Sequence, residues 1–189
     1  MAHLEIYTRR LRLLALDPAS SAAAVSDRAL FSRLIDARVP AAWPARDFAD
    51  VEAMLAAKLA ERPDELGWWG WYVIANPGVA AEHATLVGSV GCSRWGDSNL
   101  PHFGYGVLPE FERRGFATEA ATALIEWAFS RPEVTRVVAT TFERHFASIK
   151  ILERCGFENR GVSPDDDKAA ESDRQGRGKL LLFVRERAG

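Results

Sequence analysis

A strand, a short charged loop and a strong helix follow one another in the middle of this chain, and this segment limits the possible fold most. His102–Leu108 is rich in β-forming residues, and Ala117–Phe129 repeats alanine and leucine at helical spacing. The loop PEFERRGFAT (109–118) joins them. Together with the elements on either side, this segment indicates a mixed α/β sheet with helices packed on its faces.

The rest of the chain has the same mixed character. The sequence predicts strands at 5–16, 68–75, 85–95, 134–142, 157–162 and 179–187, and helices at 18–37, 47–61 and 146–155. This order is that of one α/β (α+β) domain covering residues 1–189, which is long enough to bury a full core. Asp17-Pro18 has the N-cap and first residue of a helix start, and VPAAWP (39–44) interrupts the helical sequence.

Composition argues against several classes of protein. The net charge is 24 − 26 = −2, without the basic excess of a protein that coats nucleic acid. The longest uncharged stretch, 66–81, is too short for a membrane span, and the first ten residues lack the apolar core of a signal peptide. Cys92 and Cys155 have neither a CxxC pattern nor a histidine at metal-ligand spacing. We therefore expect no metal site, and two reduced thiols in a cytoplasmic protein.

The loop 109–118 has the chemistry of an anion site. Gly115 removes a side chain where the backbone turns, Ala117 keeps the approach small, and Arg113 and Arg114 add positive charge. The first N–H groups of the following helix have no partners within the helix and lie at the positive end of its dipole. An ordinary strand–helix turn can have the same composition, and neither a Walker nor a GxGxxG pattern is present, so the loop alone leaves both interpretations open.

Three segments taken in order resemble one family: TRRLRLLAL (8–16), FGYGVLPEFERRGFATEAATALIEWAF (103–129) and RVVATTFERHFASIKILERCGF (136–157). They are similar to the general N-acetyltransferase (GNAT) superfamily, in particular its ribosomal-protein N-terminal acetyltransferase branch, over essentially the whole chain. The resemblance implies a twisted, mostly antiparallel sheet whose fourth and fifth strands, here 102–108 and 134–142, splay apart. It also implies that acetyl-CoA, the co-substrate, lies in the resulting cleft.

The resemblance assigns the contacts to the coenzyme. The pantetheine arm would pair with the backbone of the fourth strand near Val107 and Leu108. The pyrophosphate would sit on the backbone amides of the loop, which are those of Arg113, Arg114, Gly115, Phe116, Ala117 and Thr118. Three positions depart from the family pattern: Glu112 replaces an arginine or glutamine, His145 replaces the asparagine of N-x-x-S, and Leu152 stands where many members have a tyrosine general acid.

The implied reaction is direct attack of a neutral amine on the acetyl carbonyl without an acyl-enzyme, so no cysteine nucleophile is needed. Ser148 matches the serine that lies near the thioester sulfur, and it would give its hydroxyl proton to the departing thiolate. Candidates for the base are His102, which opens the fourth strand, and Glu143, which follows the fifth, although each could equally be a surface residue. His145 fits a coenzyme or helix-cap contact better than a base.

The acceptor is the least determined partner. In this superfamily the loop between the first two helices contributes to the acceptor wall, so Trp43 either shapes an acceptor pocket or packs beneath that loop. Trp68, Trp69 and Trp71 are expected mainly in the core. The polar loop 164–178 is expected to be solvated, and the alternative is an acidic flap that attracts cationic amines.

The sequence leaves several acceptor amines open: a peptide N-terminus, an amino acid, a polyamine or an aminoglycoside. We expect a monomer or homodimer that binds neither nucleic acid nor membrane. The alternative to an enzyme is a non-catalytic acetyl-CoA sensor or interaction module with the same fold, because Glu112, His145 and the missing tyrosine all depart from the pattern.

Overall fold

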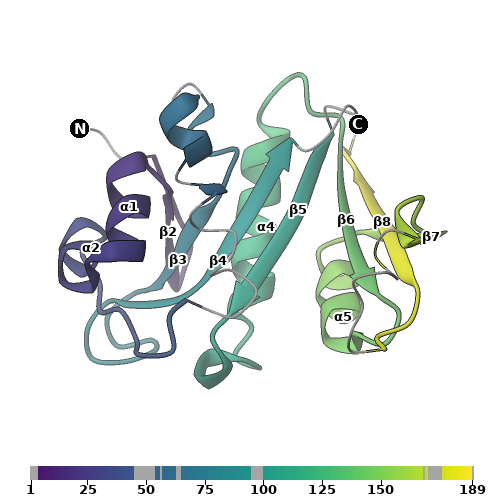
Figure 1. Cartoon of the computed structure of the whole chain (residues 1–189). Coiled ribbons are helices and arrows are strands. Elements are labelled where there is room, and N and C mark those ends of the chain that lie inside the picture. The colour runs from purple at the N-terminus through teal and green to yellow at the C-terminus, as the bar shows by residue number, and fades with distance from the viewer. Residues whose placement is uncertain are drawn as a thin grey trace.

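The computed structural model describes residues 4–44, 54–55, 57–62, 65–94, 100–167, 169 and 176–188. Its strands are β1 (Glu5–Tyr7), β2 (Leu11–Ala15), β3 (Trp71–Ala75), β4 (Thr85–Arg94), β5 (Pro101–Val107), β6 (Arg136–Phe142), β7 (Glu158–Val162) and β8 (Leu180–Glu186). They form one eight-stranded sheet in the order β1-β2-β3-β4-β5-β6-β8-β7 (Figure 1). All neighbouring strands run antiparallel except β5 and β6, which confirms the expected mixed, mostly antiparallel sheet.

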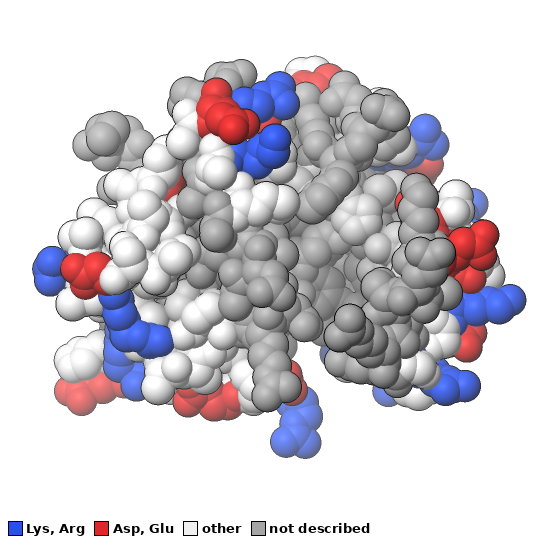
Figure 2. Space-filling view, in the orientation of Figure 1, with Lys and Arg blue, Asp and Glu red and all other residues white. Residues whose placement is uncertain are grey.

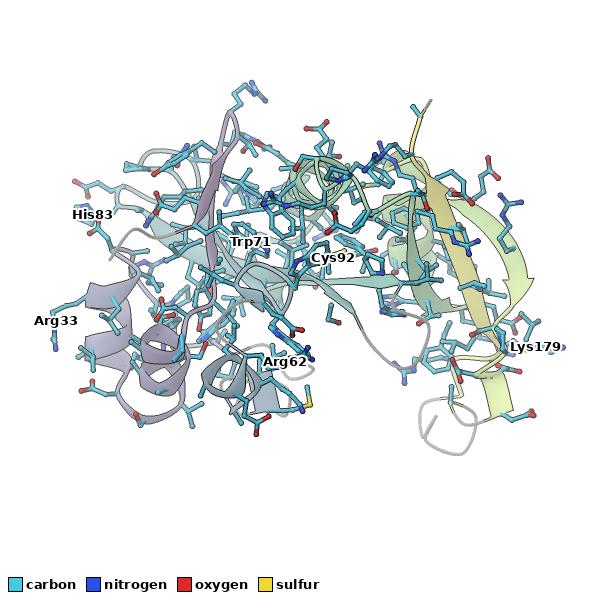
Figure 3. The ribbon with its side chains drawn as sticks, turned by 90° about the horizontal axis from the view of Figure 1, so that it is seen from above. Arg33, Arg62, Trp71, His83, Cys92 and Lys179 are labelled. Carbon is cyan, nitrogen blue, oxygen red and sulfur yellow. The ribbon has the colours of Figure 1, made fainter. Side chains whose placement is uncertain are left out.

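Helices cover both faces of this sheet, as expected. They are α1 (Pro18–Ser26), α2 (Arg28–Leu34), α4 (Phe116–Phe129) and α5 (Phe146–Arg154), with a short 3-10 helix, η2 (Pro109–Phe111), before α4. Seen from above, α1 and α2 lie on one side of the sheet and α4 on the other (Figure 3). On the sheet α4 packs mainly against β4, and also against β2 and β5, with its alanine-rich stripe buried.

Two elements expected as single units are each divided by a local side-chain hydrogen bond. The strand expected at 5–16 is a hairpin, because the Thr8 hydroxyl accepts from a backbone N–H at the start of β2, 2.9 Å away, and closes a turn. The helix expected at 18–37 is divided at Asp27, whose carboxylate accepts from two backbone N–H groups in the first turn of α2. The strand expected from residue 68 begins at Trp71.

Two further expectations lie partly outside the described residues. Of the helix expected at 47–61, residues 54–55 and 57–61 are described and are helical. Of the polar loop 164–178, residues 164–167, 169 and 176–178 are described, which leaves the choice between a solvated loop and an acidic flap untested.

The core is aromatic on both faces of the sheet. On one face the rings of Phe31 and Tyr72 are 4.9 Å apart, centre to centre, and Trp43 packs against both. On the other face Trp127 of α4 makes edge contacts with Trp68 and Trp71, at 5.0 Å and 5.3 Å. Trp71 therefore lies in the core, as predicted, whereas Trp68 and Trp69 are partly buried and pack against the core.

The sheet opens between β5 and β6. These two strands share only two pairs of residues, His102 with Val138 and Phe103 with Ala139. Beyond Phe103 the strands separate, which confirms the expected splay, and in the described part of the chain the β6-facing edge of residues 104–107 has no neighbouring strand. This opening positions the candidate site.

Candidate active site

A cleft of about 1030 Å³ lies where β5 and β6 separate. The side of the molecule in Figure 2 is indented between the half that holds β5 and the half that holds β6. Its walls come from β4, β5, the loop before α4, the first turn of α4 and the cleft-facing side of α5. Of the predicted site residues, those that line it are His102, Val107, Arg113, Gly115, Phe116, Ala117, Thr118, His145 and Ser148.

One wall of the cleft is almost without side chains. In the antiparallel register of β4 and β5, Ser89 pairs with Gly106, Gly91 with Gly104, and Ser93 with His102. Because residues alternate between the faces of a sheet, these six residues share one face, and all six line the cleft. A Cβ atom added at Gly104 or Gly106 would meet nothing within 4 Å. The cleft is thus open over β5 at these two positions.

The loop before α4 turns sharply through two left-handed residues. Arg113 has φ 59° and Gly115 has φ 79°. Gly115 is the N-cap of α4, and no side chain makes a capping hydrogen bond to the first N–H groups of that helix. Arg113 and the exposed Glu112 both line the cleft here, so the departure at Glu112 places a carboxylate beside the candidate anion site.

Two residues expected to contact the coenzyme through the backbone are not among the residues that line the cleft. Arg114 donates from its guanidinium to the carbonyl of Val79 and stacks over the Phe116 ring, and it is not among the lining residues. Leu108 is fully buried, its N–H donates to Val87 and its carbonyl accepts from Phe111. The Leu108 N–H is therefore already occupied, and the free edge of the strand ends at Val107.

Ser148 has a partner that the sequence did not predict. Its hydroxyl lies 2.9 Å from the hydroxyl of Tyr105 in β5, which also donates to the Ser148 carbonyl at 3.1 Å. Burial raises the pKa of Tyr105 to about 12, although the hydrogen bond to Ser148 opposes this. The signal for Tyr105 was its place in the segment 103–129 that carries the family resemblance, where it is the only hydroxyl-bearing residue of 101–107.

His102 lies at the other end of the open strand face. Its Nε2 is 3.2 Å from the hydroxyl of Thr140 in β6. Burial lowers the pKa of His102 from its ordinary 6.5, and the negative charge of Asp165 opposes this in part. The imidazole is consequently neutral at pH 7, which is the form that can accept a proton.

Of the other residues predicted for the site, His145 lies at the rim of the cleft, and Glu143 and Trp43 are not among its lining residues. His145, the N-cap residue of α5, lines the cleft with Nδ1 3.4 Å from the Thr141 hydroxyl. Glu143 is exposed, lies over the backbone of Gly178 and is not among the lining residues. Trp43 is 3% exposed within the core, and its neighbours Ala42 and Pro44 line the cleft instead.

The described residues hold no group of three or more potential metal ligands. Among them there is also no helix that is long and apolar enough to cross a membrane. The chemical groups at the cleft are the Tyr105–Ser148 hydroxyl pair, the His102 imidazole and the N-terminus of α4.

A sheet that opens between two strands beside an uncapped helix start defines the class expected from the motifs, an acyltransferase. The family described as "Acetyltransferase (GNAT) domain" matches residues 10–158, and the chain belongs to this family. The protein is similar to the uncharacterized N-acetyltransferase YjdG of Bacillus subtilis (strain 168), at 29% identity over 152 residues, which cover 79% of this chain and 87% of YjdG.

Solved structures share the fold. A putative GnaT-family acetyltransferase from Bordetella pertussis aligns with a TM-score of 0.65 and 20% identity, over 96% of this chain and 99% of that one. RimL, a ribosomal L7/L12 alpha-N-protein acetyltransferase in complex with coenzyme A, aligns with a TM-score of 0.63 and 12% identity, over 97% and 98% of the two chains. These similarities confirm the fold, and the family assignment makes the protein an acyltransferase.

Proposed function

We propose that this protein transfers the acetyl group of acetyl-CoA directly to an amine, either the N-terminal α-amine of a peptide or protein or a small-molecule amine. The observation that carries the proposal is the continuous path from the free edge of β5 to the uncapped start of α4. When bound, acetyl-CoA supplies the acetyl group as a thioester. RimL, which has the same fold, is described with coenzyme A bound and as acting on a protein α-amine.

The residues along this path suit the two ends of such a ligand. Backbone groups of residues 104–107 can pair with the amides of a pantetheine arm as a peptide pairs with a sheet edge. The N–H groups from Gly115 to Thr118, with the Arg113 guanidinium, suit the charge of a pyrophosphate. His145 lies at the rim, where it can donate a hydrogen bond.

We assign His102 as the base that accepts a proton from the amine. Glu143 is not retained, because it lies outside the cleft. At pH 7 an α-amine with a pKa near 7.8 is about 14% neutral, whereas a lysine amine near 10.4 is about 0.04% neutral. Deprotonation therefore costs about 1 kcal/mol for the first amine and about 4.6 kcal/mol for the second. A weakly basic imidazole is best suited to the α-amine, or to another amine of low pKa.

Ser148 holds the proton that the departing thiolate receives. It is 8% exposed and lines the cleft, and its hydroxyl lies 2.9 Å from that of Tyr105. The one proton of the Tyr105 hydroxyl is donated to the Ser148 carbonyl, and it can turn to the Ser148 hydroxyl oxygen when that oxygen gives up its own proton. Tyr105 acts through Ser148 and is a positioning residue. Leu152, where many relatives have a tyrosine, is 1% exposed and packs in the core, so Ser148 and Tyr105 provide the hydroxyls on this side of the cleft.

A base and a hydroxyl pair in one cleft support catalysis rather than coenzyme sensing alone. The two buried cysteines suit a reducing, cytoplasmic environment, where we expect a monomer or homodimer.

Calorimetric titration with acetyl-CoA is the first test. We expect a dissociation constant of about 10 μM or tighter, equivalent to about −7 kcal/mol. A panel of amines, including short peptides with free N-termini, is then assayed by release of free thiol, with Ser148→Ala as the control. Tight binding without turnover on any amine would favour the sensor, and no binding at millimolar acetyl-CoA would refute both.

A further inference from the structure

The turn between β1 and β2 reaches across the molecule to the loop before α4. Arg10 in this turn donates from Nη1 to the carbonyl of Arg114 at 3.0 Å, and its guanidinium lies 4.9 Å from the centre of the Phe116 ring. Its Nε donates to the carboxylate of Glu119 at 2.6 Å, and its backbone N–H donates to the same carboxylate at 3.0 Å. One side chain thus contacts the loop, the first residue of α4 and the first turn of α4.

Thr8 completes this network. Its hydroxyl donates to Oε1 of Glu119 at 2.6 Å, whereas the Nε of Arg10 donates to the other carboxylate oxygen, Oε2. The side chains of Arg10 and Glu119 are only 28% and 18% exposed, so their ion pair is partly shielded from solvent. Partial burial raises the pKa of Glu119, but the hydrogen bonds from Thr8 and Arg10 lower it further, so the net shift is downward and the carboxylate stays charged.

The loop needs support from outside because its backbone is unfavourable. Arg113, which is not glycine, has φ 59°, a left-handed conformation in which the Cβ of a non-glycine residue crowds the following carbonyl oxygen. Gly115 follows two residues later with φ 79°. The carbonyl that Arg10 holds belongs to Arg114, between these two left-handed residues. A Cβ added at Gly115 would lie 3.3 Å from Nη2 of Arg10, so the guanidinium also lies close over the turn.

The ion pair between Arg10 and Glu119 also changes the charge beside the candidate anion site. Glu119 lies in the first turn of α4, beside the N–H groups that suit an anion. An uncompensated carboxylate there would repel a pyrophosphate, whereas the ion pair with Arg10 neutralises it. Beside this turn the charges of Arg113 and Glu112 then offset each other, and the positive helix terminus remains to attract an anion.

We infer that Arg10 is a positioning residue for the acyl donor: it fixes the shape and the charge of the 113–118 turn, and so sets the affinity for the diphosphate part of the coenzyme. This inference rests on the proposed function. It assigns a role in coenzyme binding to a residue that lies outside the cleft, 104 residues from the loop carbonyl that it holds.

Arg10→Lys and Arg12→Lys form a matched pair of variants. Arg12 lies two residues further along, forms an ion pair with Glu5 at 2.8 Å and is 17% exposed, but it contacts the backbone at Ile35 rather than the loop. Lysine keeps the charge in both variants but cannot hold two acceptors in the fork geometry of arginine. Thr8→Val, which removes the bond to Glu119 and the turn-closing bond from the Leu11 N–H but keeps Arg10, is a third variant in case Arg10→Lys folds poorly.

Each variant is titrated with acetyl-CoA by calorimetry, and with S-acetylpantetheine, which lacks the diphosphate, by ligand-observed NMR. For Arg10→Lys we expect affinity for acetyl-CoA at least tenfold weaker, with affinity for S-acetylpantetheine changed less than twofold. For Thr8→Val we expect acetyl-CoA affinity about threefold weaker, and for Arg12→Lys a change of less than twofold. Guanidinium chloride at 20 mM, compared with sodium chloride at 20 mM, should restore part of the acetyl-CoA affinity of Arg10→Ala.

Two results would overturn the inference. One is wild-type affinity for acetyl-CoA in folded Arg10→Lys and Thr8→Val. The other is an equal loss for both donors, which would indicate general damage to the cleft. Failure of the wild-type protein to bind acetyl-CoA would instead refute the proposed function, so the two failures are distinguishable.

Discussion

Two glycines in neighbouring strands have opposite surroundings, and alanine at each should change stability in opposite directions. A Cβ at Gly88 in β4 would lie 2.2 Å from the carbonyl oxygen of Gly106 and 3.0 Å from the Cα of Val107. A Cβ at Gly104 in β5 would meet nothing within 4 Å, because it would project over the bare face of the cleft. The pair therefore tests both the register of β4 and β5 and the openness of the cleft.

The magnitudes follow from these distances. A glycine inside a strand is about 0.5–1 kcal/mol less favourable than alanine, so Gly104→Ala should raise the free energy of unfolding by about that amount. In a domain of this size 1 kcal/mol shifts Tm by about 2–4 °C, which gives a rise of about 1–4 °C. At Gly88 the added carbon must displace a backbone carbonyl. Overpacking of this kind costs about 1–3 kcal/mol, so Tm should fall by at least about 2 °C.

Gly104→Val extends the same argument to catalysis. No atom lies within 4 Å of the Cβ position at Gly104, so we expect the larger side chain to fill part of the open strand face without lowering Tm. The rate of acetyl transfer should nevertheless fall at least about tenfold, because substrate must approach this face. Thermal unfolding is followed by circular dichroism and turnover by thiol release, with the fastest amine of the panel. Destabilisation by Gly104→Ala would show that the face is not open, and full activity of stable Gly104→Val would show that substrate does not cross it.

Three further predictions concern the side chains of the site. His102→Gln should lower kcat/KM at pH 7 by about 10²–10⁴-fold, while the calorimetric affinity for acetyl-CoA changes less than twofold. In the wild type we expect the rate to fall as the pH drops through the pKa of His102, which lies below 6.5, and the variant should not show this fall. Ser148→Ala should lower kcat about 10²-fold with a nearly unchanged KM for acetyl-CoA, measured by steady-state kinetics. Tyr105→Phe should remove the phenolate absorbance step near pH 12 and lower the free energy of unfolding by about 1 kcal/mol in urea titration. Because the folded pKa exceeds the unfolded value, the stability gained from burying this neutral phenol is present below about pH 10 and is lost as pH rises toward 12.

The sequence could predict the features that depend on neighbouring residues. The glycine, the arginines and the following helix start predicted the turn at 109–118, and the structure has Gly115 in a left-handed conformation as the N-cap of α4. The alternation of strands and helices predicted the mixed sheet, and the family resemblance predicted the opening between β5 and β6.

Features that depend on distant residues could not be predicted in the same way. The partner of Arg10, Glu119, is 109 residues away, and the partner of Ser148, Tyr105, is 43 residues away. Trp43 had two equal interpretations because its loop could face the cleft or the core. The choice depends on Phe31 and Tyr72, whose rings meet Trp43 only in the folded chain.

The contacts across the cleft connect substrate binding with the arrangement of the two halves of the sheet. β5 and β6 share only two residue pairs, so the part of the sheet formed by β6, β8 and β7 is joined to the rest by few backbone bonds. The Tyr105–Ser148 hydrogen bonds join β5 to α5 across this opening, and α5 also contacts α4. The bond that holds the Ser148 hydroxyl in place therefore also holds α5 against β5. Loss of the Tyr105 hydroxyl should accordingly affect both the position of Ser148 and the width of the cleft.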